Sequence, residues 1–114
     1  MLRMIDQRVI QEFINNQDIG KIILKNPDVK NSTVVLEKNL ETRKIIMSNR
    51  FVYSQYSSNK LSLGQYTDPE QIVHVAKMMG CTHYDPEELE DTIEKAKYNR
   101  RMVDAVLRNQ RSTL

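Results

Sequence analysis

The chain has 114 residues, of which 39% are hydrophobic and 28% charged, and it carries a single cysteine. This composition predicts one folded domain, 1–114, with a modest core, and it excludes an internal disulfide and a long disordered tract. The sequence contains no run of 18 or more apolar residues. We therefore expect no membrane-spanning helix and a cytoplasmic location.

The net charge of +2 is unevenly distributed along the chain. It is −1 for residues 1–20, +5 for 21–60, −7 for 61–94 and +5 for 95–114. Such blocks can indicate binding partners. Charges also stabilise helix ends and protect sheet edges, so each block has to be weighed within its own structural element.

Residues 3 to about 17 are predicted to form a helix within the segment 1–20. Asn15, Asn16 and Gly20 follow as stop signals. The apolar residues of this segment recur at helical spacing, with charged residues between them: Ile5, Val9, Ile10, Phe13 and Ile14.

Residues 21–60 are predicted to form a small antiparallel β-meander that is basic overall. The runs STVVLEK and RKIIMS are followed by RFVYSQYSS, and all three are rich in β-branched, apolar or aromatic residues. On a strand over the third run, Phe51 and Tyr53 share one face and Tyr56 lies on the other. The next stretch, SSNKLSLGQY, is expected to be a loop or a short edge strand.

Residues 67–111 are predicted to form a C-terminal αα-hairpin with a long last helix. Asp68-Pro69-Glu70 is a helix-start signal, and Asp85-Pro86-Glu87 repeats it. Gly80 is suited to end the first helix, because it takes a positive φ without a Cβ penalty. The second helix is expected to run from 86 to about 109, since no Gly or Pro interrupts it. The fold class is therefore α+β.

The connection between these helices holds the only cysteine, Cys81, and one of the two histidines, His83. A structural zinc site usually needs four ligands, and with His74 the sequence offers three. A cysteine nucleophile needs an oriented base, for which there is no signature here. A recognition helix that begins with Glu87 and its acidic neighbours would repel DNA phosphates. We interpret the connection as a structural joint and expect no enzyme activity, metal or cofactor.

The last helix is about 36 Å long at 1.5 Å per residue, whereas a compact domain of this size has a radius of gyration of about 13 Å. A heptad-like row runs along it, and this row can pack on the helix's own domain or on a second copy. The row comprises Leu89, Ile93, Ala96, Arg100, Val103 and Leu107. The residues expected at an interface are those near the free end: Met102, Val103, Val106 and Leu107.

An antiparallel pair of these helices is favoured over a parallel one. Arg100 would face its copy in a parallel zipper, and the two charges would repel. An antiparallel pair instead places the acidic start, Glu87 to Glu94, beside the basic end, Arg100 to Arg111. The expected function is therefore a small non-enzymatic interaction or regulatory protein that forms a homodimer or another homo-oligomer. Another protein is a further candidate partner.

Nucleic-acid binding is the alternative function. Basic side chains beside aromatic rings suit single strands, because bases stack on the rings while cations follow the phosphates. This alternative requires the basic segments 21–60 and 95–114 to form one surface. Its candidate residues are Arg50, Phe51, Tyr53, Tyr56, Arg100, Arg101 and Arg108.

Overall fold

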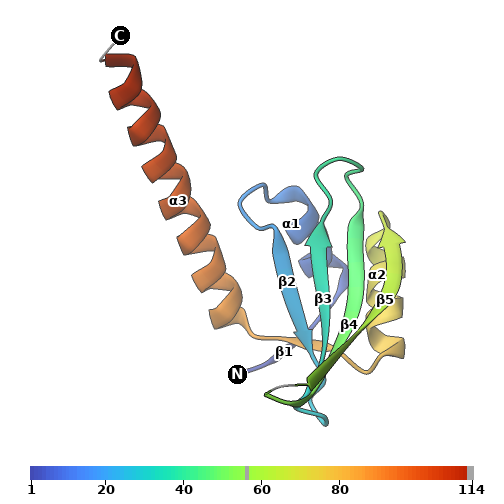
Figure 1. Cartoon of the computed structure of the whole chain (residues 1–114). Coiled ribbons are helices and arrows are strands. Elements are labelled where there is room, and N and C mark those ends of the chain that lie inside the picture. The colour runs from blue at the N-terminus through green and yellow to red at the C-terminus, as the bar shows by residue number, and fades with distance from the viewer. Residues whose placement is uncertain (56, 113–114) are drawn as a thin grey trace.

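The computed structural model describes residues 1–55 and 57–112, with side chains described through residue 109. This part of the chain forms three helices and one six-stranded antiparallel sheet, an α+β arrangement (Figure 1). The strand order across the sheet is β1-β6-β2-β3-β4-β5. The α+β prediction is confirmed, and the sheet is larger than predicted.

Four strands form the body of the sheet. They are β2 (Lys21–Lys25), β3 (Ser32–Lys38), β4 (Ile45–Ser54) and β5 (Ser57–Tyr66). Each pairs antiparallel with the next along the chain, as the predicted meander requires. β5 is an edge strand of ten residues, longer than the loop or short strand expected. Its Ser-rich sequence carries little strand propensity, and pairing with β4 holds it in place.

Two short strands extend the sheet at its other side. β1 (Arg3–Met4) pairs with β6 (His83–Tyr84), and β6 pairs with β2 at Lys25. Beside them the Ile5 N–H donates to the Thr82 carbonyl oxygen at 2.8 Å. The prediction that the first helix begins near residue 3 is therefore wrong, because this segment is extended and joins the sheet.

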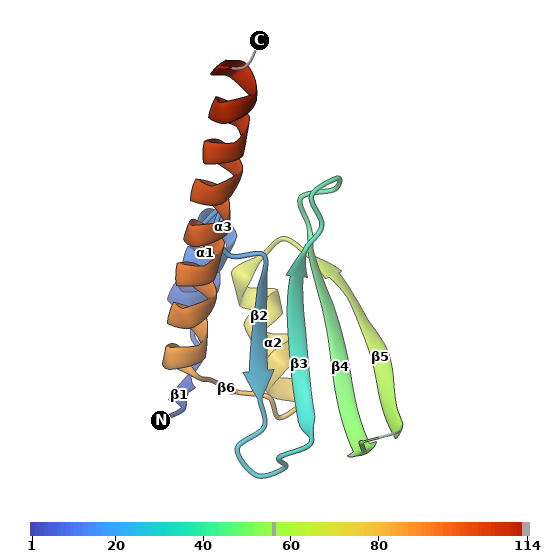
Figure 2. The ribbon, with the colours of Figure 1, turned by 60° about the vertical axis from the view of Figure 1, so that its left-hand side comes forward.

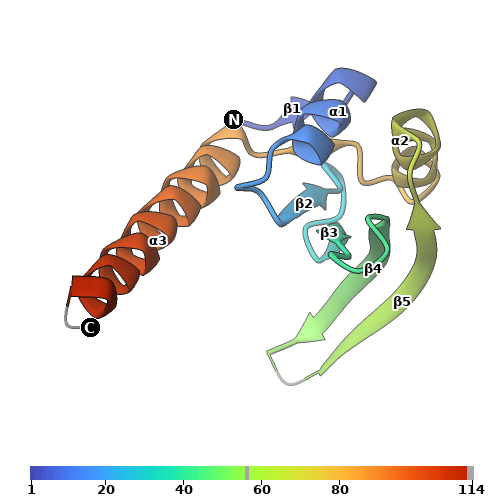
Figure 3. The same ribbon diagram turned by 90° about the horizontal axis from the view of Figure 1, so that it is seen from above.

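Helices α1 (Gln7–Asn15) and α2 (Pro69–Met78) cover one face of the sheet (Figure 3). α1 begins where the Asp6 carboxylate accepts the Val9 N–H at 2.9 Å. α2 begins at the predicted cap, since the Asp68 carboxylate accepts the Glu70 N–H at 3.0 Å. Each helix therefore starts at an aspartate, which satisfies N–H groups that lack partners within the helix.

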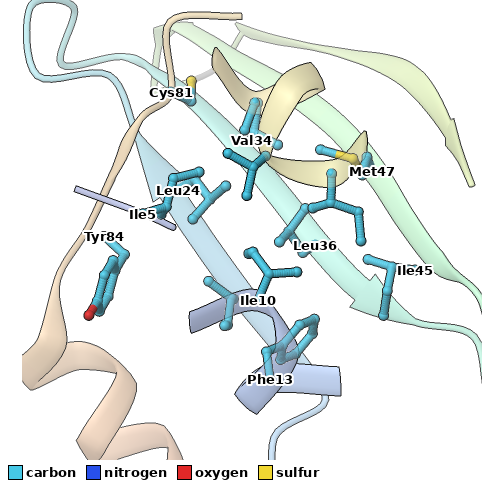
Figure 4. Close-up of a cluster of buried hydrophobic side chains, with 14 of the residues drawn as sticks. Ile5, Ile10, Phe13, Leu24, Val34, Leu36, Ile45, Met47, Cys81 and Tyr84 are labelled. Carbon is cyan, nitrogen blue, oxygen red and sulfur yellow. The ribbon is translucent and has the colours of Figure 1, made fainter. Parts of the chain in front are cut away.

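The hydrophobic core lies between the sheet and these two helices (Figure 4). α1 contributes Ile10 and Phe13, and α2 contributes Ile72 and Ala76. The sheet contributes the side chains that alternate toward the helices along its strands. These are Ile22, Leu24, Val34, Leu36, Ile45 and Met47, and all are buried.

The predicted αα-hairpin is wrong. After α2 the chain crosses the end of the sheet as β6 and only then enters α3 (Pro86–Ser112), so α2 and α3 lie on different sides of the domain (Figure 1). The cause lies in the connection, where Cys81 and Tyr84 are buried in the core. Burial of these side chains draws the connection into the sheet. α2 packs against α1 instead.

Helix α3 projects from the domain, as its length predicts (Figures 1 and 2). It ends at Ser112, close to the predicted residue 109. The radius of gyration is 16.5 Å, compared with about 13 Å for a compact chain of this length. The principal extents, 55 × 34 × 28 Å, show the same elongation.

Candidate interaction surface on the last helix

The start of α3 is fixed by the joint that precedes it. The Asp85 carboxylate accepts the Glu87 N–H at 3.0 Å and the Glu88 N–H at 3.5 Å, and Pro86 is the first residue of the helix. Glu87 and Glu88 lie in the first turn, where the helix dipole favours negative charge. The acidic block of the sequence therefore stabilises a helix start, as the sequence indicated.

The near half of α3 is held on its own domain. Leu89 and Ile93 pack against the edge of the core. Glu88 pairs with Lys25 of β2 at 2.8 Å, and Arg100 pairs with Asp18, which follows α1, at 3.0 Å. The two ion pairs lie three turns apart, so together with the apolar contacts they fix how α3 is rotated about its axis.

The far half of α3 leaves the domain and carries an apolar groove. Met102, Val103, Val106 and Leu107 line a shallow hollow and are about half exposed, with Val103 at 57% and Leu107 at 47%. Every residue from Lys97 to Asn109 is exposed. An apolar strip of this kind on a projecting helix is typical of a binding surface.

The heptad-like row identified in the sequence divides at Arg100. Leu89, Ile93 and Ala96 are partly buried at the domain, whereas Val103 and Leu107 continue the row into solvent. The near half of the row therefore packs on the helix's own domain. Self-association of the far half stays a prediction.

Tyr98 is a candidate contact residue that the sequence analysis missed. Its side chain is 63% exposed, and it lines a second shallow hollow with Glu94, Lys95 and Asn99. The heptad-like row faces the domain at its near end, and Tyr98 lies on the opposite side of the helix from that row. A search for apolar residues four positions apart would have found it, since Met102 and Val106 follow at that spacing.

The β4 residues proposed for nucleic-acid binding lie on two faces of the sheet. Arg50 is exposed opposite Lys60 of β5, on the face that α1 and α2 leave uncovered. Phe51 and Tyr53 point to the other face, with ring centroids 4.8 Å apart, so their predicted common face is confirmed. Tyr56 lies outside the described residues.

The candidate arginines of α3 with described side chains do not lie beside Arg50. Arg100 is engaged with Asp18. Arg101 and Arg108 are exposed on the side of α3 opposite Glu88, and Glu88 is the residue that reaches the sheet. The basic segments 21–60 and 95–114 therefore do not present these candidate residues on one surface.

Cys81, His83 and His74 occupy three separate environments. Cys81 is buried, and burial raises the pKa of its thiol, while a hydrogen bond with Ser32 lowers it in part. The His83 ring forms a hydrogen bond with the Thr82 hydroxyl, with 2.8 Å between Nδ1 and Oγ1, and His74 is exposed on α2. Among the described residues, no group of three or more His, Cys, Asp or Glu side chains is placed to hold a metal ion.

Comparisons with protein-family models, curated proteins and solved structures find no match to this chain. None of the helices within residues 1–55 and 57–112 combines the length and apolar character needed to cross a membrane.

Proposed function

We propose that the protein is a small non-enzymatic interaction or regulatory protein that self-associates through the far half of α3. The observation that carries the proposal is the groove of Met102, Val103, Val106 and Leu107, on a stretch of α3, Lys97 to Asn109, in which every residue is exposed. Covering apolar surface is favourable, by about 25 cal/mol per Å². A second copy supplies a cover of the same kind, and symmetric dimers are the commonest assembly.

The charge pattern of α3 supports an antiparallel pair. Arg100 gives no reason against a parallel pair, because it is engaged with Asp18 of its own domain. The acidic start and the exposed basic residues Arg101 and Arg108 remain as opposed blocks. An antiparallel arrangement turns the basic end of each helix toward the acidic start of the other.

Sedimentation of a Val103→Asp, Leu107→Asp double variant tests the proposal. We expect the wild-type protein to dimerise with concentration and the variant to remain monomeric with an unchanged circular dichroism spectrum. Ala105→Asp is the matched control, because Ala105 is exposed on the other side of the same helix. A wild-type protein that is monomeric at high micromolar concentration, or a folded double variant that still dimerises, would contradict the proposal.

Nucleic-acid binding is a second candidate function. It is supported by two basic residues, Arg50 of β4 and Lys60 of β5, which lie opposite each other on the sheet face that α1 and α2 leave uncovered. The position of Phe51 and Tyr53 on the other face counts against one site that both stacks bases and binds phosphates. If the candidate is correct, binding to oligonucleotides should weaken steeply with salt. Tyr53→Ala should then cost about 1–3 kcal/mol for a stacked base. The absence of binding at low salt would remove this candidate.

A further inference from the structure

The geometry points to a particular mode of contact between two copies, in which Tyr98 inserts beside the apolar groove of the partner copy. This inference rests on the proposed self-association. The proposed contact includes Tyr98, which lies outside the heptad-like row. The two copies of α3 cross over a short stretch and do not form a long coiled coil.

The surface of α3 consists of ridges of side chains with grooves between them. Side chains four residues apart form a ridge, and Tyr98, Met102 and Val106 have this spacing. Asn99, Val103 and Leu107 form the neighbouring ridge. The hollow lined by Met102, Val103, Val106 and Leu107 is the groove between these two ridges. Tyr98 extends the first ridge toward the domain and is 63% exposed.

Such a groove accepts a ridge of the same spacing. When ridges of this kind interdigitate, the two helices cross at about 50°. A second copy of α3 presents the ridge of Tyr98, Met102 and Val106 and offers the matching groove. Each copy can therefore place its ridge in the groove of the other across a two-fold axis near Met102. An unrelated helix would have to reproduce both features.

The charges set the sense of the crossing. A parallel crossing would bring the basic residues Arg101 and Arg108 of both copies to the same side. An antiparallel crossing instead turns Arg108 toward the part of the partner helix that carries Glu94, while Arg101 stays at the crossing point in either sense. The antiparallel sense therefore separates the two Arg108 side chains, and it also places the two domains at opposite ends of the contact.

The size of the contact sets the affinity range. Five half-exposed side chains, Tyr98 with the four of the groove, supply on the order of 100 Å² each. Two copies then bury roughly 1,000 Å², at the low end for specific protein interfaces. We therefore infer a reversible dimer that forms at micromolar or higher concentration, and the tests must cover that range.

The first test compares Tyr98→Ala with Lys97→Ala by sedimentation equilibrium. We expect Tyr98→Ala to weaken dimerisation about tenfold or more, and Lys97→Ala to change it less than twofold. Tyr98 lies on the opposite side of α3 from Ala96, Arg100 and Val103, so a coiled coil along that row would not use it. An unchanged dimer in Tyr98→Ala overturns the inference.

The second test uses introduced cysteines. A Met102→Cys variant should form a disulfide-linked dimer under mild oxidation, because the two-fold axis lies near this position, whereas an Arg101→Cys variant should not. The native Cys81 is buried and does not compete. If both variants crosslink equally, or neither does, the crossed contact is wrong.

These results separate the inference from the proposed function. Loss of the dimer in Val103→Asp, Leu107→Asp together with an intact dimer in Tyr98→Ala would support self-association by another packing. A wild-type monomer at high concentration would overturn both.

Discussion

Gly80 shows how one residue shapes the joint between α2 and β6. Its φ is 72°, and a Cβ placed there would lie 2.9 Å from the Asn26 Nδ2. Asn26 cannot easily move away, because its Oδ1 accepts the N–H groups of Asp28 and Val29. The position therefore needs glycine for both conformation and space, as the sequence indicated for conformation.

Gly80→Ala should lower the free energy of unfolding by at least about 1–2 kcal/mol, the usual cost of left-handed backbone for a residue with a Cβ. Gly20→Ala is the control, because its φ is not positive and a Cβ there meets no atom within 4 Å. We expect the control to change stability by less than about 0.5 kcal/mol. Urea denaturation measures both variants, and equal losses would show that the Gly80 backbone can relax.

The Cys81 thiol, in the connection between α2 and β6, makes the stability of the fold depend on pH. Burial raises the pKa of its thiol, so the native state keeps the proton to higher pH than the unfolded state does. The thiol therefore contributes its full stability below the unfolded pKa of about 8.5, and this contribution falls as pH rises further. We expect the stability difference between wild type and Cys81→Ala to shrink between neutral and alkaline pH. A difference that stays constant from about pH 7 to 10 would contradict this.

At the scale of elements, the sequence predicted the features that depend on a few neighbouring residues, such as the starts of helices. Asp68 and Asp85 cap helices where the sequence placed them, because a cap depends on a few neighbouring residues. β1 and β6 were missed, because a two-residue strand has no periodic pattern and exists through its partner. The αα-hairpin was wrong for the same reason, since burial of Cys81 and Tyr84 is decided by the assembled core.

The candidate surface on α3 was predicted in part. The apolar residues near its free end follow helical spacing, so Met102, Val103, Val106 and Leu107 could be found from the sequence. The point where α3 leaves the domain could not be predicted from the sequence. It coincides with the Arg100–Asp18 ion pair, which joins residues that are distant in the sequence. The role of Tyr98 depends on that point and on the rotation of the helix, and therefore required the structure.

The attachment of α3 gives a prediction of its own. Arg100→Ala should loosen the near half of the helix, because it removes one of the two ion pairs that, among the described residues, tie it to the domain. Partly exposed pairs contribute up to about 1 kcal/mol, so amide hydrogen exchange around Leu89 to Ala96 should be roughly 2- to 5-fold faster. Arg101→Ala is the control, since Arg101 faces solvent. Equal exchange in both variants would indicate that the apolar contacts alone hold the helix.

At the scale of the whole molecule, α3 separates the candidate interface from the domain. The near half fixes the helix to the edge of the sheet, and the far half carries the groove away from the core. Association through the far half leaves the rest of the domain surface free, including the sheet face that carries Arg50. Self-association and a further binding event on that face are therefore compatible in one assembly.

The sense of pairing can be tested at this scale by small-angle scattering at two salt concentrations. An antiparallel crossing places the domains at opposite ends, so the dimer should be clearly longer than the 55 Å of one copy, roughly 80 Å given the rise of the helix. It should also be tighter at low salt, because charges are screened beyond about 8 Å at 0.15 M ionic strength. Arg108→Glu should remove the low-salt advantage and leave the dimer intact at high salt. A dimer no longer than the monomer, or one that tightens steadily as salt is added, would contradict antiparallel pairing and indicate that apolar contact alone sets the arrangement.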